Sequence, residues 1–164
     1  MEIIDISLDE KVIDIPLDDE ITVFVRNATI DDFIAIYLLN IYGLGYDYPM
    51  EKTKKRVASI LLNTNAKLLV AEVDGNVVGY AHAVDYDCSY SDSLKNLLAI
   101  AVDEEYKGKG VGRALITAVE KWALSSGSVG VRLVSSMYRT GSHKFYEKCG
   151  YSVRKDQKNY VKLF

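Results

Sequence analysis

The stretch AVDEEYKGKGVGRALITAVEKWA, residues 101–123, joins a strand-like run to a helix-like run through a loop rich in glycine and lysine. Glycines occupy positions 108, 110 and 112, although glycine weakens both helices and strands. Three glycines at alternate positions indicate that something approaches the backbone closely. The lysines and arginine of the loop, with the positive end of the following helix dipole, favour a phosphate group.

Two common phosphate-binding loops do not fit this stretch. A P-loop needs Ser or Thr after Gly-Lys at the helix start, whereas Gly112 is followed by Arg113 and Ala114. A dinucleotide-binding fingerprint needs its third glycine at position 113 and an acidic residue at the end of a second strand. Neither feature is present, so the loop belongs to another class of phosphate site.

The segments around the loop predict alternating strands and helices. Residues 94–102 are apolar on both faces, as in a central strand covered by helices on both sides. Asp74-Gly75 is typical of a tight hairpin turn. The other predicted elements are a strand at 20–26, a helix capped by Thr29, a helix with Pro49 in its first turn, a helix from Gly110 to about Ser126, a strand at 129–135, a helix within 141–151 stopped by Gly150, and final strands YSVR (151–154) and NYVKLF (159–164).

Composition indicates a globular chain with one domain over residues 1–164, because 49% of the residues are hydrophobic and 26% are charged. Residues 1–20 predict an N-terminal arm or an extra edge strand. The net charge of -3 gives no basic footprint for nucleic acid, and no apolar run is long enough to span a membrane. The acidic N-terminus and only two cysteines, without metal-ligand spacing, favour a cytoplasmic protein with no metal site.

Two motifs resemble the GNAT superfamily of N-acetyltransferases. KGKGVG (107–112) resembles the family's loop for acyl-coenzyme A, although Lys107 stands where Arg or Gln is usual. HKFYEKCGY (143–151) resembles a late family segment of Phe-Tyr followed by Gly-aromatic. The resemblance covers roughly residues 20–164 and implies an α/β (α+β) fold, with a mixed, mostly antiparallel central sheet of about six to seven strands flanked by four helices.

The same resemblance implies that acetyl-coenzyme A is the cosubstrate. Its pantetheine arm would pair with the backbone at the end of the central strand, and its pyrophosphate would lie in the glycine loop. The residues assigned to the cosubstrate in this way are Ile100, Ala101, Val102, Lys107, Gly108, Lys109, Gly110, Val111, Gly112 and Arg113.

Tyr146 occupies the family's tyrosine position and is predicted to be the general acid that protonates the departing thiolate. The alternative is that it only packs beside Phe145. Asn96 falls where some members carry a glutamate, and an amide cannot serve as the base. The base stays open among Glu72, His82, Asp85, Asp87 and His143. Cys149 is predicted to fill a gap in the core and not to carry the acetyl group as an acetyl-enzyme. Direct transfer of the acetyl group to the acceptor is therefore predicted.

The acceptor is predicted to be a primary amine of a small molecule or a peptide. Tyr46 and Asp85 are expected to line an acidic and aromatic mouth for it, with a solvated loop as the alternative. The rival function is a non-catalytic module that binds acyl-coenzyme A as a sensor or for interaction. The sequence leaves open the identity of the amine, the use of other acyl groups and the formation of a homodimer.

Overall fold

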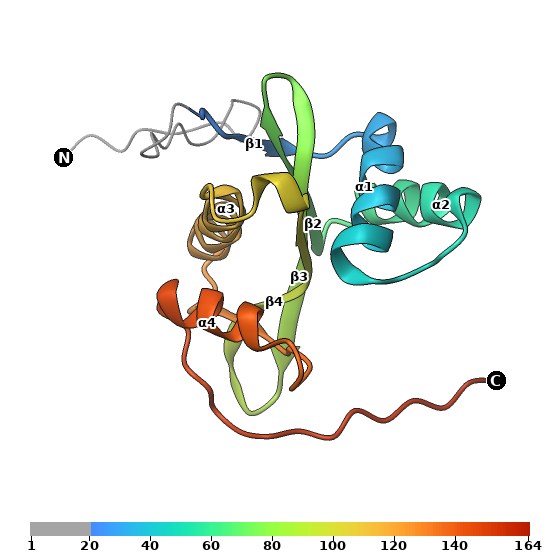
Figure 1. Ribbon diagram of the computed structural model, residues 1–164. Coiled ribbons are helices and arrows are strands. Elements are labelled where there is room, and N and C mark those ends of the chain that lie inside the picture. Colours follow the sequence, from blue (N-terminus) through green and yellow to red (C-terminus); the bar gives the residue numbers. More distant parts are fainter. Residues whose placement is uncertain (1–20) are drawn as a thin grey trace. The chain divides into compact units, whose positions relative to one another are not determined.

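The computed structural model describes residues 21–164, which fall into two compact units, one extending to Val134 and one comprising Ser135–Phe164. Figure 1 shows the elements along the chain. The first unit contains β1 (Phe24–Asn27), η1 (Ile30–Asp32), α1 (Phe33–Leu39), η2 (Asn40–Leu44), α2 (Met50–Leu61), β2 (Ala66–Val73), β3 (Asn76–Cys88), β4 (Ser91–Val102), η3 (Glu104–Tyr106), α3 (Val111–Ser125) and β5 (Val131–Leu133). The second unit contains α4 (Thr140–Lys148).

The strands form one sheet in the order β1-β2-β3-β4-β5. All neighbouring pairs are antiparallel except β4 and β5, which are parallel. The predicted mixed, mostly antiparallel sheet and four α-helices are therefore confirmed, but β3, and not β4, is the middle strand. The hairpin between β2 and β3 turns at Asp74 and Gly75, whose φ angles are 50° and 77°, as the dipeptide predicts.

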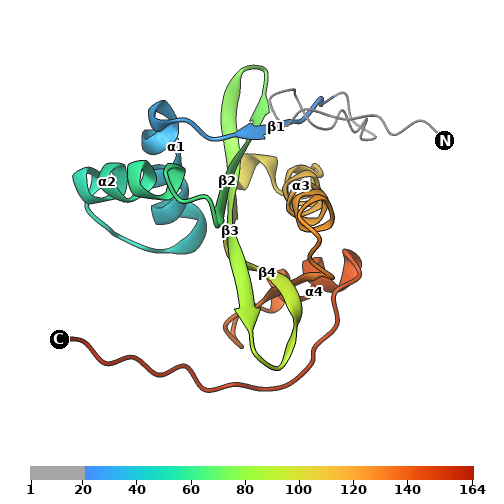
Figure 2. The same ribbon diagram turned by 180° about the vertical axis from the view of Figure 1, so that it is seen from behind.

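Two layers of helices cover the two faces of the sheet. Figures 1 and 2 show α1 and α2 on one face and α3 on the other. On β3, Tyr80 packs in a buried cluster with Ile36 and Leu39 of α1. A Cβ atom at the neighbouring Gly79 would lie 3.0 Å from the Val111 side chain of α3. Because successive side chains of a strand point to opposite faces, β3 packs against the helices on both faces of the sheet.

α3 buries an apolar stripe of side chains against the sheet. Val111, Leu115 and Val119 are fully buried, and each such side chain contributes about 1.5–3 kcal/mol to folding. Gly79 presents no side chain to this helix, which permits its close approach. The packing fixes the first turn of α3 just after the end of β4.

The prediction of six to seven strands is wrong for the described part of the chain. Residues 151–164 form no strand, although YSVR and NYVKLF have strand-like patterns. Val153 and Val161 are 80% and 82% exposed, so these side chains gain neither burial nor the cross-strand pairing that stabilises a strand. The predicted arm or edge strand at 1–20 lies outside the described residues.

Among residues 21–164, no helix combines the length and the apolar character needed to cross a membrane. Within the same residues, no cluster of three or more His, Cys, Asp or Glu side chains is arranged to hold a metal ion.

Candidate active site

β4 has one open edge at its C-terminal end. β3 pairs with β4 as far as Val102, whereas β5 pairs only with Lys95–Leu97. Within residues 21–164, the segment 98–102 therefore has no strand partner on the β5 side. This edge includes three residues that are predicted to contact the cosubstrate, namely Ile100, Ala101 and Val102.

The hydrogen-bond pattern indicates which main-chain groups face outward there. The Asp103 N–H donates to the Val78 carbonyl at 2.8 Å, toward β3. Residues of an antiparallel pair alternate between facing their partner and facing away from it. The N–H and C=O groups of Ala101 thus face β3, and those of Ile100 and Val102 face the open edge. An extended ligand can add to such an edge as a further strand does.

A β-bulge interrupts β4 immediately before this edge. His82 pairs with Ala99 and Ala83 pairs with Leu97, so that Leu98 is an extra residue without a partner on β3. A bulge bends its strand and redirects main-chain groups. Nothing in the sequence marks this bulge, because Leu98 lies inside a continuous apolar run that is typical of a regular strand.

The glycine loop connects the end of β4 and η3 to α3. Gly108 and Gly110 have φ angles of 76° and 84°, a left-handed conformation that glycine adopts without the strain of a Cβ atom. Gly110 is the residue before the first turn of α3. An α-helix leaves its first N–H groups without intrahelical acceptors, and in α3 these include the N–H groups of Val111 and Gly112. The loop therefore has the geometry of an anion site.

Two lysines of the loop are held beside η3. Lys107 forms an ion pair with Glu104, three residues earlier. The Nζ atom of Lys109 lies 5.4 Å from the centre of the Tyr106 ring. Both lysine side chains are exposed, so they add positive charge near the loop without closing it.

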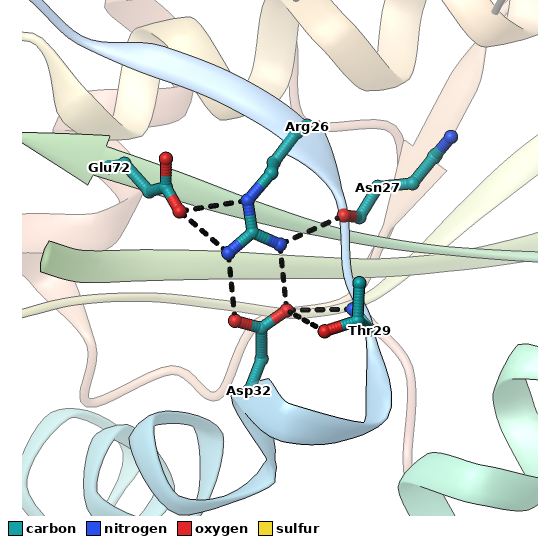
Figure 3. Close-up of polar contacts among 5 residues, drawn as sticks. All are labelled: Arg26, Asn27, Thr29, Asp32 and Glu72. Carbon is teal, nitrogen blue, oxygen red and sulfur yellow. Dashed lines mark hydrogen bonds and ion pairs between the residues drawn. The ribbon is translucent and has the colours of Figure 1, made fainter. Parts of the chain in front are cut away.

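Glu72, a candidate base, belongs to a network that joins β1, β2 and η1 (Figure 3). Arg26 donates from Nε to Glu72 at 2.8 Å, and from Nη1 and Nη2 to the two carboxylate oxygens of Asp32 at 2.8 and 2.9 Å. Burial raises the pKa of Asp32, but hydrogen bonds from Arg26 and Thr29 outweigh burial and lower it overall. Glu72 therefore has a structural partner.

Asp85 is paired as well. It forms an ion pair with Lys95, which is 3% exposed and whose Nζ lies 4.1 Å from the centre of the Trp122 ring in α3. Tyr46 is 63% exposed and follows η2, on the side of the sheet that α1 covers. The structure thus places Tyr46 and Asp85 toward opposite faces of the sheet and does not bring them together.

The remaining polar candidates differ in their surroundings. Asn96 accepts a hydrogen bond from Arg132 Nη1 at 2.7 Å. His143 Nε2 lies 3.0 Å from the Ser136 carbonyl, and Asp87 is exposed. His82 is different: burial and then the charge of Arg56 lower its pKa, and its Nε2 is buried without a hydrogen-bond partner among residues 21–164.

Tyr146 lies on α4 in the second unit. Its ring centre is 5.3 Å from that of Phe145 and 6.1 Å from that of Tyr151. Burial raises the pKa of the phenol, Arg139 opposes this effect and Cys149 adds to it. The phenol therefore keeps its proton at neutral pH, as a proton donor must.

Curated relatives share this chain's sequence over parts of their length. An uncharacterized N-acetyltransferase of Methanocaldococcus jannaschii is 26% identical over 87% of this chain and 66% of its own. The N-acetylaspartate synthetase of Homo sapiens is 34% identical over 50% of this chain and 26% of its own, and the streptothricin acetyltransferase of Escherichia coli is 31% identical over 51% and 45%. The chain thus spans between about a quarter and two thirds of these relatives.

Solved structures share the fold. The aminoglycoside N-acetyltransferase AAC(6')-Iy in complex with CoA superposes with a TM-score of 0.79, at 20% identity over 90% of this chain and 99% of its own. A transcriptional regulator from Bacillus halodurans superposes with a TM-score of 0.76, at 18% identity over 85% of this chain and 99% of its own. At these identities the likeness establishes the architecture.

Residues 29–151 match the model of the acetyltransferase (GNAT) family. The matched range includes the open edge of β4, the glycine loop, α3 and Tyr146. Acetyl-coenzyme A is the cosubstrate of this family, so the prediction of that cosubstrate is confirmed at the family level. The chain belongs to the acetyltransferase (GNAT) family.

Proposed function

We propose that this protein is an N-acetyltransferase that moves the acetyl group of acetyl-coenzyme A directly to a primary amine. The observation that carries the proposal is the continuity of two features. The open edge of β4 at Ile100–Val102 leads through the left-handed glycines 108 and 110 to the N-terminus of α3. One extended ligand with a pyrophosphate group is complementary to both features.

In the proposed reaction, the amine nitrogen attacks the carbonyl carbon of the thioester. A main-chain N–H group of the open edge, near the bulge at Leu98, stabilises the oxyanion that develops. The nitrogen loses a proton to solvent, the bond between the carbonyl carbon and sulfur breaks, and the thiolate takes a proton from Tyr146. The Tyr146 phenolate then regains a proton from solvent. Burial raises the pKa of the Tyr146 phenol, so the phenol is protonated at neutral pH and has a proton to donate.

The relatives favour nitrogen as the accepting atom. Their names refer to N-acetylaspartate, to streptothricin and to N-alpha-acetylation, and several structural neighbours are aminoglycoside acetyltransferases. These names describe small molecules and peptides of different chemistry. They support a primary amine as the acceptor class for this chain without choosing among its members.

The proposal is tested by measuring thiol release from acetyl-coenzyme A with a panel of amines, with mass spectrometry of the products. We expect release that depends on the amine and a product that is heavier by one acetyl group on nitrogen. Calorimetry with acetyl-coenzyme A alone gives a separate reading. Binding without turnover on any amine would favour the non-catalytic sensor, and the absence of binding would refute both functions.

A further inference from the structure

A recess lies between α1, α2 and the face of the sheet formed by β2 and β3. Its volume is about 140 Å³. Its apolar wall includes Ile36, Val57 and Leu68, which belong to the buried cluster on this face. Its polar lining residues are Asn40, Tyr48, Thr53, Arg56, Tyr80 and His82.

Two buried polar atoms of this lining have no hydrogen-bond partner among residues 21–164, namely Thr53 Oγ1 and His82 Nε2. Thr53 is only 4% exposed. Buried polar side chains in folded proteins are almost always hydrogen-bonded, and two such atoms in one small recess indicate that a ligand supplies the missing partners. Helix α2 brings Thr53 to this position, one turn before Arg56 and Val57.

The lining has the charge of an anion site. Arg56 is its charged residue, and none of the described residues that line the recess is Asp or Glu. Tyr80 donates its hydroxyl hydrogen to Asn40 Oδ1, which leaves the two N–H hydrogens of the Asn40 amide to serve as donors. A guanidinium, a hydroxyl and an amide together suit a carboxylate, which accepts hydrogen bonds from all three.

Part of the recess lies one strand away from the open edge of β4. Tyr80 and His82 are opposite Ala101 and Ala99 on β4, and neighbouring strands lie about 4.8 Å apart. One strand therefore separates this part of the recess from the open edge. An acceptor bound in the recess has to span this width to bring its amine to the edge.

We propose that the recess is the acceptor subsite and that the acceptor is an amine that also bears a carboxylate, such as an amino acid. Arg56 and Thr53 bind the carboxylate, and the amine extends toward the bulge at Leu98. This inference rests on the proposed acetyltransferase function. It reverses the expectation of an acidic mouth, because Asp85 is paired with Lys95 and the recess carries positive charge instead.

The test compares amino acids with their carboxamides, which keep the amine and lack the carboxylate charge. We expect the wild type to show a KM at least about 10-fold lower for the best amino acid than for its carboxamide. Arg56→Gln should remove this difference. Lys55→Gln is the matched control, because it deletes the same charge from an exposed neighbour on α2 that does not line the recess, and it should keep the difference.

Thr53→Val separates binding from folding. Its hydroxyl has no protein partner, so its removal should leave the melting temperature unchanged or higher, while the KM for the amino acid rises about 3-fold to 10-fold. Equal KM values for amino acids and carboxamides, or equal effects of Arg56→Gln and Lys55→Gln, would overturn the inference while leaving the acetyltransferase function intact.

Calorimetry provides a reading that does not depend on turnover. The twenty amino acids and their carboxamides are titrated into the protein saturated with coenzyme A. We expect at least one amino acid to bind to the wild type and to Lys55→Gln, and not to Arg56→Gln. If no amino acid binds, the subsite assignment fails, even where another amine is acetylated. If an amino acid binds but no amine is acetylated, the proposed function fails and the acceptor role fails with it, and the recess is left only as a carboxylate-binding site.

Discussion

At the scale of single residues, Tyr146 lies on α4 and Cys149 lies at its C-terminal end, and the two side chains are suited to different roles. Burial raises the pKa of the Tyr146 phenol, which is protonated at neutral pH. Cys149 is the C-terminal cap of α4, and its N–H donates to the carbonyls of Phe145 and Tyr146. A thiolate nucleophile is favoured at a helix N-terminus, whereas the C-terminal end of a helix dipole is negative. The position of Cys149 therefore favours direct transfer over an acetyl-enzyme.

Tyr146→Phe should lower kcat by roughly 10²-fold to 10⁴-fold, which is the ordinary contribution of one acid catalyst. Affinity for acetyl-coenzyme A should hardly change, because the ring that contacts Phe145 and Tyr151 is kept. Steady-state kinetics and calorimetry check the two parts. Cys149→Ala is the control and should retain turnover; a single-turnover rate that is equal in Tyr146→Phe and wild type would contradict the assignment of the acid.

At the scale of elements, the start of α3 joins a loop with left-handed glycines to a buried helix. Gly110 has a φ of 84°, which costs a residue with a Cβ atom roughly 1–2 kcal/mol. The helix behind it is anchored by Val111, Leu115 and Val119. The loop therefore keeps its main-chain N–H groups in place without side-chain ligands, and we expect cosubstrate binding to depend on backbone geometry more than on Lys107 or Lys109.

Gly110→Asp and Gly110→Asn form a matched pair that separates charge from backbone strain. Asn and Asp both tolerate the left-handed conformation better than other side chains, and they differ by one charge. We expect Gly110→Asp to bind acetyl-coenzyme A at least about 30-fold more weakly than Gly110→Asn, because the carboxylate repels the pyrophosphate. Calorimetry measures both affinities. Equal affinities would place the phosphates away from the loop.

The Arg26 network shows how the first strands and η1 are joined. Asp32 is 7% exposed, and Arg26 is 33% exposed. The pKa of Asp32 is lowered in the folded protein. The ionised Asp32 carboxylate therefore stabilises the folded protein at pH values above the pKa of the unfolded state, which is about 4. That stabilisation is lost as the pH falls further, through the lowered pKa of the folded state.

Asp32→Asn should reduce the free energy of unfolding at pH 7 by about 2 kcal/mol, less than for a fully buried pair because Arg26 remains in contact with water. The difference from wild type should shrink below about pH 4, where the wild-type carboxylate becomes protonated first in the unfolded chain and then, at its lowered pKa, in the folded protein. Urea denaturation at several pH values measures both effects. Asp31→Asn, at an exposed neighbour, is the control and should change stability little; a constant difference at all pH values would exclude ionisation as the cause.

At the scale of the whole molecule, cosubstrate binding should be visible as stability. A ligand that binds only the folded state adds about 2.7 kcal/mol at a concentration of 100 Kd. For a chain of 164 residues this corresponds to a rise in melting temperature of roughly 5–10 °C. The effect requires the two ends of the proposed cosubstrate site, the β4 edge and the α3 N-terminus, to form in one folded state.

We expect acetyl-coenzyme A to produce this rise in thermal melts of the wild type, and ATP and NAD to produce none. Gly110→Asp should lose most of the rise while Gly110→Asn keeps part of it. A rise with ATP or NAD that equals the rise with acetyl-coenzyme A would indicate a general phosphate site instead of one for acyl-coenzyme A.

Much of the fold follows from local sequence. The turn at Asp74-Gly75 and the left-handed Gly110 before α3 adopt the φ angles that their residue types favour. The order of elements through α4 also follows the predicted order. These features depend on hydrogen bonds and side-chain spacing within a few residues, so the sequence itself encodes them.

Other features were decided by contacts between residues distant in the sequence. The strand-like patterns at 151–164 do not form strands, because a strand requires a partner edge that no local pattern specifies. The ion pair that occupies Asp85 and the bulge at Leu98 depend on the register of β3 against β4. The recess combines Asn40, Thr53 and His82 from η2, α2 and β3. Only tertiary packing brings these side chains together, because neither their charge nor their spacing along the chain specifies which helix lies over which strand.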